Sequence, residues 1–250
     1  MKKQQEKVVE FYNSIAKNYK SRYDKNNPFF QYFFIGRMIE ATRNENFEGK
    51  SILDIGAGPG NLYDFIKKET KEFEYFGTDI TEGMLEHSSI PAERRFVGHC
   101  YDLKLPLKEY DYIFLLGVTT YMPPDELQKT ISFVERHLSL KGKAIITFTN
   151  RGSIDYFTRF VLGFFIRPLG LKNSVLGQNM AIYSYTKKQI VKILSPKFKI
   201  ERISHLNQTV FPFNRAFKNF SIIVAKVARK HFSEFFIGPL SSDILIVFKK

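Results

Sequence analysis

The stretch SILDIGAGPGNLYDF, residues 51–65, decides the fold. A short apolar run ends in Asp54, and three glycines then follow within a few residues before helix-forming residues resume. A glycine-rich turn between a strand and a helix lets the backbone approach a ligand closely, because no Cβ atom intervenes. It also presents free backbone N–H groups at the start of the helix. The stretch therefore predicts a ligand site at the end of a buried strand.

The spacing of the glycines argues against a dinucleotide as that ligand. The turn reads G-x-G-x-G, whereas the dinucleotide pattern G-x-G-x-x-G would place its third glycine at Asn61. Asp54 is also poorly suited to a pyrophosphate but well suited to an ammonium group. A second acid, Asp79, ends the next apolar run and is placed to accept hydrogen bonds from both hydroxyls of a ribose. The two acids together predict a nucleoside with a cationic arm.

Strand and helix patterns alternate through the middle of the chain. Short apolar strands separated by helices indicate a parallel sheet with helices on both faces. An amphipathic helix at 2–23 and an aromatic helix from Pro28 precede this region, and a helix from Thr186 follows it. We expect strands at 51–55, 73–78, 94–98, 110–116, 143–149 and about 198–205, a last strand in DILIVFKK, and helices near 61–69, 81–89 and 123–138.

Five segments, in order, resemble the motifs of the class I S-adenosylmethionine-dependent methyltransferases, in particular those acting on small molecules. These segments are ILDIGAGPG, FGTDITEGML, RRFVGHCYDLKLP, YDYIFLLGVTTYM and KGKAIITFTN, and they cover about residues 45–150. Near the N-terminus, SIAKNYKSRYD resembles the I-A-x-x-Y-D helix that closes over the cofactor in this family. Two further strands after residue 150 would complete the sheet of the family.

The resemblance implies an α/β fold: a Rossmann-like, doubly wound, seven-stranded and mostly parallel sheet with helices on both faces and an antiparallel last strand. It implies S-adenosyl-L-methionine as the cofactor and S-adenosyl-L-homocysteine as the product. The positions that match the family's cofactor motifs are Tyr19, Asp54, Gly56, Ala57, Gly58, Gly60, Asp79, Ile80, Met84, His99, Cys100, Asp102, Leu116 and Gly117.

The third region departs from the family pattern. The acid that contacts adenine usually follows the glycine directly, but His99 follows Gly98 here, and Asp102 comes three residues later. Either Asp102 takes the role through a shifted loop, which we favour, or His99 and the backbone of Cys100 serve the adenine edge. Tyr19 likewise has an alternative, as one more residue of the apolar face of its helix.

Methyl transfer from a sulfonium is an in-line displacement that depends mainly on alignment and exclusion of water. An amine or hydroxyl acceptor needs at most a base to take its proton. The two candidates for that role are Tyr121, just past the fourth strand, and His205, near the end of the sixth. The sequence contains no Cys or His cluster that would supply a metal site, so we expect none.

Composition sets the cellular context. Cys100 is the only cysteine, which rules out an intramolecular disulfide and suits a reducing cytoplasm. The N-terminus lacks the apolar core of a signal peptide, so we expect a cytoplasmic protein, with contact at the membrane periphery as an alternative. The net charge of +13 is consistent with nucleic acid, an anionic membrane or an acidic substrate as partner, and equally with a lysine-rich coding bias.

Substrate choice should depend on the segments outside the cofactor half. We expect one methyltransferase domain over 1–250, with a helical cap at 1–46, a core at 47–150 and an aromatic insert or lid at 151–185. The remaining half, 186–250, carries a basic amphipathic insertion at about 210–237.

Each late segment has two interpretations. The aromatic residues of 153–171 either pack against the N-terminal aromatics as a lid or line an apolar pocket or lipid patch. The basic helix at 214–231 either packs on the sheet or lies on an anionic membrane. We favour methylation of a small metabolite such as a sugar or amine. The alternatives are a lipid-linked or quinone-like acceptor at the membrane surface, and RNA methylation or a role as a cofactor-binding subunit.

Overall fold

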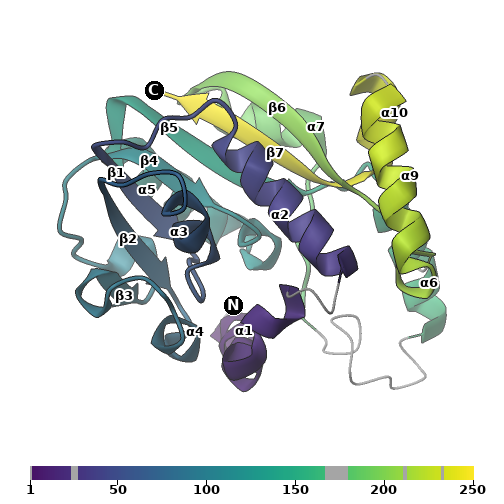
Figure 1. The fold of residues 1–250 in the computed structure, drawn as a ribbon, viewed down its shortest axis with the longest axis horizontal. Helices are drawn as coiled ribbons and strands as arrows, with labels where there is room; N and C mark the ends of the chain where they lie inside the picture. The colour runs from purple at the N-terminus through teal and green to yellow at the C-terminus, as the bar shows by residue number, and fades with distance from the viewer. Residues whose placement is uncertain (1, 24–27, 167–179, 211–212, 232–233) are drawn as a thin grey trace.

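The computed structural model describes residues 2–23, 28–166, 180–210, 213–231 and 234–250. It contains a seven-stranded sheet in the order β3-β2-β1-β4-β5-β7-β6 (Figure 1). β1 to β5 pair in parallel, and β7 runs antiparallel between β5 and β6. The expected doubly wound sheet with an antiparallel last strand is therefore confirmed. The strands are β1 Lys50–Ile55, β2 Phe73–Asp79, β3 Arg95–Val97, β4 Tyr110–Leu115, β5 Leu138–Thr149, β6 Lys199–Gln208 and β7 Ser241–Lys249.

Helices cover both faces of the sheet (Figure 1). They are α1 Lys2–Ile15, α2 Pro28–Thr42, α3 Asn61–Ile66, α4 Glu82–Glu86, α5 Pro124–His137, α6 Ile154–Ile166, α7 Lys187–Leu194, α8 Phe213–Ala216, α9 Lys218–His231 and α10 Glu234–Leu240. The sequence pattern predicted one continuous helix over 2–23. The structure instead ends α1 at Ile15 and continues in two short 3-10 turns, Ala16–Asn18 and Lys20–Tyr23.

The central strands are buried on both faces, as expected for continuous apolar runs between two helical layers. Leu53 and Ile113 belong to a core cluster on one face, and Ile52 and Phe114 belong to a cluster on the other. All four side chains have no exposed surface. Since side chains alternate along a strand, both layers are fixed by the same strands. The carboxyl ends of β1, β2 and β4 thereby meet at one rigid edge.

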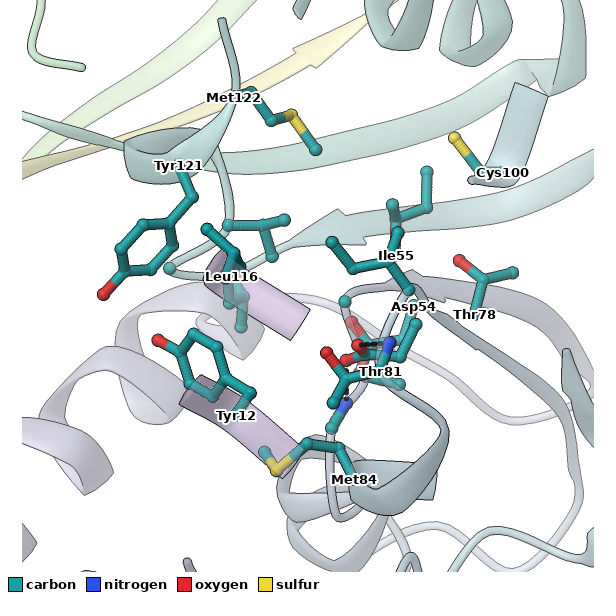
Figure 2. Close-up of a pocket in the computed structure, with 18 of the residues that line it drawn as sticks. Tyr12, Asp54, Ile55, Thr78, Thr81, Met84, Cys100, Leu116, Tyr121 and Met122 are labelled. Carbon is teal, nitrogen blue, oxygen red and sulfur yellow. Dashed lines mark hydrogen bonds between the residues drawn. The ribbon is translucent and has the colours of Figure 1, made fainter. Parts of the chain in front are cut away.

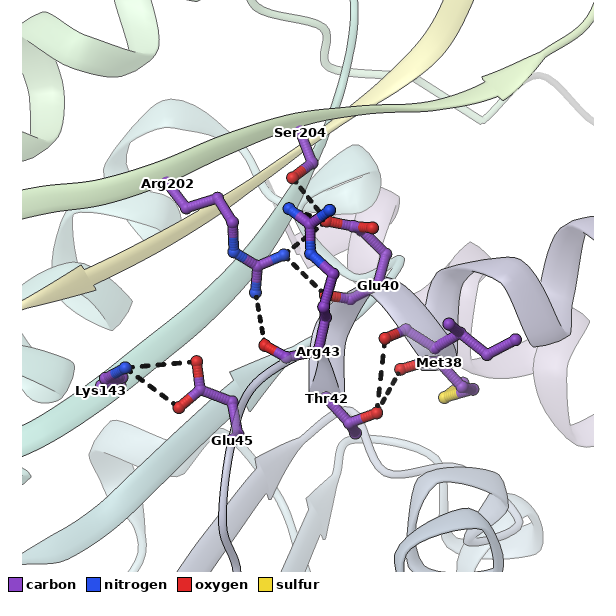
Figure 3. A network of polar contacts seen from close by, with 9 residues as sticks. Met38, Glu40, Thr42, Arg43, Glu45, Lys143, Arg202 and Ser204 are labelled. Atoms are coloured by element: carbon purple, nitrogen blue, oxygen red, sulfur yellow. Dashed lines mark hydrogen bonds and ion pairs between the residues drawn. The ribbon is translucent and has the colours of Figure 1, made fainter. Parts of the chain in front are cut away.

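Polar contacts fix the C-terminal part of α2 to the sheet (Figure 3). The guanidinium of Arg202 on β6 donates to the Glu40 carboxylate, which also accepts the Ser204 hydroxyl at 2.7 Å. Just beyond the helix, Glu45 forms an ion pair with Lys143 of β5 at 3.1 Å. Because these partners are partly buried, the pairs hold the helix more firmly than surface ion pairs would.

The structure shows how the described parts of the two late segments pack. The N-terminal aromatics Phe29 and Phe33 pack with Ala225 of α9, so α9 is their partner in this cluster. α9 packs on α2 and beside β6, but most of its large apolar side chains remain exposed. In α6, the side chains of Phe157 and Phe160 are likewise exposed, and residues 167–179 of the expected aromatic insert or lid lie outside the described residues.

Candidate cofactor and active site

The glycine turn after β1 has the geometry that the sequence suggested. Gly56, Gly58 and Gly60 have φ values of 76°, 52° and 80°, in the left-handed region that favours glycine. A Cβ atom on Gly56 would lie 2.3 Å from a Val118 methyl carbon, and one on Gly58 would lie 3.2 Å from Met84 Cε. The turn is therefore a cradle that only glycine can form at this approach.

Asp79 lies at the carboxyl end of β2, beside this turn. Its Oδ2 accepts the backbone N–H of Gly58 at 3.0 Å, and its Oδ1 accepts that of Thr81 at 2.8 Å. Burial raises the pKa of the carboxyl, while these two hydrogen bonds lower it. Two fixed donors thus orient the carboxylate where it lines the cavity described below.

Asp54 is more deeply buried, with 4% of its surface exposed. Its Oδ2 accepts a hydrogen bond from the Tyr75 hydroxyl at 2.7 Å. Desolvation, with a smaller contribution from the charge of Asp79, raises the pKa of Asp54 to about 7 against the lowering effect of the Tyr75 hydrogen bond. A carboxylate so short of compensating charge favours a cationic ligand group, which would lower its pKa again.

One cavity connects these groups, and Figure 2 shows it from close by. Its floor comes from the carboxyl ends of β1, β2 and β4, and its cover comes from α1 and α2. Nearly all the positions expected for cofactor contact line it: Tyr19, Asp54, Gly56, Ala57, Gly58, Asp79, Ile80, Met84, His99, Cys100, Leu116 and Gly117. Tyr121, the first candidate base, lines it as well.

Three expected residues do not line the cavity. Gly60 is buried beneath the turn, where a Cβ would meet the hydroxyls of Ser88 and Ser89. Asp102 is exposed in the loop after β3, because the short 3-10 helix Cys100–Asp102 turns its side chain to solvent. His205 sits on β6 beside Gly238, at the far end of the sheet from β1 and β2. The roles we expected for Asp102 and His205 are therefore not supported by their positions.

The cavity contains a further acid, which the sequence motifs do not identify. Glu126, in the first turn of α5, is buried and lines the cavity beside His99 and Cys100. Its Oε2 accepts the Gln5 amide at 2.9 Å, and its Oε1 lies 3.3 Å from His99 Nδ1. The hydrogen bond between Glu126 and His99 is the main reason that the pKa of His99 is raised. In the sequence, Glu126 was indistinguishable from an ordinary acid at a helix start.

Tyrosines form the wall opposite the acids. The ring of Tyr12 packs edge-on against that of Tyr121 with centroids 5.7 Å apart, and its centroid lies 6.1 Å from that of Tyr19. Figure 2 shows the rings of Tyr12 and Tyr121 on one side of the cavity, across from Asp54 and Thr81. The sequence motifs give no role to Tyr12, which lies on α1, seven residues before the expected contact Tyr19.

The cover is held by polar contacts from α1 and the turn after it. Besides Gln5, the side chain of Asn13 accepts the backbone N–H of Gly83 at 3.0 Å, and Gln4 exchanges two hydrogen bonds with the backbone of Ala181. Lys20 pairs with Asp64 of α3 at 3.0 Å. These bonds are individually weak, so the cover is the part of the site that is easiest to open.

The described residues contain neither a candidate metal site nor a candidate membrane span. Within them, no group of three or more His, Cys, Asp and Glu side chains is placed to hold a metal ion. None of the helices in the part of the chain that the structure describes is long and apolar enough to cross a membrane.

Comparisons with known proteins agree with this geometry. Residues 52–142 match the model of a methyltransferase domain family. An uncharacterised methyltransferase of Bacillus subtilis, YdaC, is 31% identical over 107 residues, which are 41% of this chain and 58% of that protein. The chain thus spans little more than half the length of this relative.

Solved structures resemble the whole chain. Magnesium protoporphyrin IX methyltransferase of Synechocystis, with bound S-adenosylhomocysteine, superposes with a TM-score of 0.63 at 17% identity, covering 99% of this chain and 100% of its own. The N-methyltransferase NodS of Bradyrhizobium japonicum, also with S-adenosylhomocysteine, has a TM-score of 0.60 at 9% identity, covering 99% and 98%. At such identities the likeness concerns the fold. The matched segment shows a methyltransferase-like domain at residues 52–142, and the strand order and the superpositions show that the chain has the fold of these methyltransferases.

Proposed function

We propose that the cavity binds S-adenosylmethionine and that the chain methylates a small-molecule acceptor. The observation that carries this proposal is the placement of Asp79, whose two oxygens are oriented by backbone donors beside the glycine turn. A carboxylate fixed in this way retains lone pairs for the two ribose hydroxyls. The cradle at Gly56 and Gly58 fits the group as well, since any side chain there would fill it.

The remaining parts of the cofactor have matching surroundings. Asp54, buried and short of positive charge, suits the ammonium of the methionine arm. His99 and Glu126 offer polar atoms to the adenine edge, next to the apolar Met122. We assign Glu126 the adenine role that the sequence motif suggested for Asp102.

Bound in this way, the cofactor supplies a methyl group activated by its sulfonium. The chain contributes alignment and exclusion of water, which α1 and its tyrosines provide. Tyr121 and Tyr12 line the wall beyond the glycine turn, so their hydroxyls are the candidates to orient an acceptor or accept its proton. Because α1 and α2 cover the cavity, it favours a small acceptor over a polymer.

The cofactor assignment is tested by calorimetry with S-adenosylmethionine. Asp79→Ala should weaken binding at least about tenfold, since hydrogen bonds to a charged group contribute roughly 1.5–3 kcal/mol each. Asp79→Asn keeps the size of the side chain and should also weaken binding. The matched control is Asp102→Ala, which removes an exposed acid outside the cavity and should leave affinity unchanged. Equal affinities for the wild type and both Asp79 variants would contradict the proposal.

The acceptor class is tested by the fate of a labelled methyl group. The protein is incubated with methyl-labelled S-adenosylmethionine and a cell extract, which is then separated into water-soluble metabolites, lipids and RNA. Label in the metabolite fraction that depends on Tyr121 is the expected result. Label confined to RNA would refute a small-molecule acceptor.

A second candidate, methylation of a lipid-linked or quinone-like acceptor, is favoured by one specific observation. Large apolar side chains of α6 and α9 are exposed at the β6–β7 end of the sheet. In the labelling experiment, this candidate predicts label in the lipid fraction.

A further inference from the structure

An ordinary amphipathic helix buries its large apolar side chains, whereas α9 buries mainly small ones. The residues it buries are small, Ser221, Ala225 and Ala228, and they allow a close approach to α2. Ala225 has no exposed surface and packs with Phe29 and Phe33 of α2. The aromatic rings in this contact therefore come from α2, and the one large apolar side chain that α9 adds to it is the partly buried Ile222.

Apart from Ile222, the large apolar residues of α9 face solvent. Phe220, Ile223, Val224 and Val227 follow the spacing of one side of a helix, and each is between 45% and 64% exposed. Phe217 and Phe213 extend the same exposed series toward α8. We call these residues, Phe213, Phe217, Phe220, Ile223, Val224 and Val227, the apolar ridge. An apolar surface of this kind on a protein marks an interaction site.

The charge around the apolar ridge has one sign. Residues 213–231 contain five Lys and Arg residues and no Asp or Glu. Lys226 lies over the ring of Tyr32, and Arg229 donates to Gln208 at 2.8 Å, so these two cations are attached to the body of the protein. Lys218 and Lys230 are exposed on the same helix. A partner for this surface must be apolar and anionic at once.

α6 adds further exposed aromatic residues at the same end of the sheet. Phe157 and Phe160 are 65% and 72% exposed. α6 packs on β7 and α10, and α9 packs beside β6, so both helices belong to the end of the sheet opposite β3 (Figure 1). The apolar surface is therefore concentrated at one end of the molecule.

We propose that the apolar ridge docks on the surface of an anionic lipid bilayer. Its side chains enter the boundary between head groups and acyl chains, while Lys218 and Lys230 contact the anionic head groups. A second copy of the chain fits less well, because a symmetric contact would bring two basic, acid-free helices together. An RNA backbone would satisfy the charge but leave the phenylalanine and valine side chains in water.

The test is co-sedimentation with vesicles, which requires neither cofactor nor acceptor. The full chain should bind vesicles of mixed phosphatidylcholine and phosphatidylglycerol at least about tenfold more strongly than vesicles of phosphatidylcholine alone. Phe220→Ser with Val224→Ser should reduce this binding at least about tenfold. Lys218→Glu with Lys230→Glu should abolish the preference for the anionic vesicles. Because the readout is vesicle binding, it can fail while cofactor binding succeeds, or the reverse.

A matched control is available elsewhere on the surface. Leu140 on β5 and Val97 on β3 are 81% and 48% exposed. The double variant Leu140→Ser with Val97→Ser should leave vesicle binding unchanged. Equal binding by the wild type and the Phe220 and Val224 double variant, with the same unfolding midpoint, would overturn the proposal. So would a dimer, seen by sedimentation velocity without vesicles, that the same double variant dissociates.

Discussion

The two ends of the sheet depart from ordinary protein surfaces in opposite directions. Near β1 and β2, the carboxyl group of Asp54 is buried and that of Asp79 is half-buried. Near β6 and β7, large apolar side chains such as Phe160 and Phe220 are left in water. A buried charge and an exposed apolar patch are the two informative exceptions to the rule that hydrophobic residues lie inside.

The comparison shows two different ways in which such an exception is maintained. Asp79 is held by backbone donors of the strand end and the glycine turn, so part of its desolvation is offset within the protein. The apolar ridge has no such compensation among the described residues, and its stabilisation has to come from what it contacts. One end is thus complete as a folded structure, and the other is completed by a partner.

The largest expected effect is a difference in the free energy of unfolding between a variant of α7 and a variant of α9. Both helices are basic and amphipathic, but Ile190 and Leu194 of α7 have no exposed surface. Leu194→Ala should lower the free energy of unfolding by about 2–5 kcal/mol, because it removes buried methyl groups and leaves a cavity. Phe220→Ala should change it by less than about 0.5 kcal/mol. Denaturant unfolding of both variants measures the difference; comparable losses would mean that the apolar ridge is part of the core.

A smaller effect concerns the buried carboxylate Asp54. Its pKa of about 7 means that it is mostly protonated at pH 6 and half ionised near pH 7. An ammonium group binds the ionised form, so affinity for S-adenosylmethionine should rise about fivefold from about pH 6 to about pH 7. Calorimetry across this range measures the slope.

Asp54→Asn is the control for this dependence, since it cannot ionise and should flatten the profile. The raised pKa of Asp54 also predicts that the folded state becomes less stable as the pH rises, whereas cofactor binding becomes stronger. Because the pKa of Asp54 is raised from 3.8, its favourable contribution is fully present below pH 3.8 and is lost as the pH rises through 7. A wild-type binding profile identical to that of Asp54→Asn would show that the carboxylate does not meet the ammonium.

The smallest effect is expected from the cover over the acids. Gln5→Ala removes the hydrogen bond from α1 to Glu126, but Gln4 and Asn13 still hold the helix. We therefore expect cofactor affinity to fall only about twofold to threefold, within the net range of one hydrogen bond. Glu6→Gln, at an exposed position of the same helix, should have no effect. A loss as large as that of Asp79→Ala would mean that the cover, rather than the acids, dominates binding.

Local sequence patterns were sufficient for the cofactor half of the fold. The strands expected at 51–55, 73–78 and 110–116 all form, because short apolar runs between glycine-rich and polar turns have few alternatives. The helix expected over 2–23 was wrong in its second half, which breaks into 3-10 turns after Ile15. There the chain bends over the cavity, and helical periodicity by itself does not register such a bend.

The residues of the candidate site likewise divide into those that the sequence identified and those that it could not. Asp54 and Asp79 follow strand ends at fixed offsets, so the sequence identified both acids before their geometry was known. Asp102 and Glu126 could not be sorted by sequence, because their positions depend on how the loop after β3 meets α5. A contact between segments so far apart in the chain has no local signature.

The sequence by itself determined that residues 214–231 form a basic amphipathic segment, since the spacing of apolar and charged residues is a property of the helix alone. Only the tertiary structure decided which side faces inward. The small side chains of Ser221, Ala225 and Ala228 admit α2 at close range, whereas Phe220 and Val224 on the neighbouring side would hold it away. The close packing of α9 on α2 therefore turned the apolar side of α9 outward. This packing depends on both helices, so the sequence of one helix alone does not determine it.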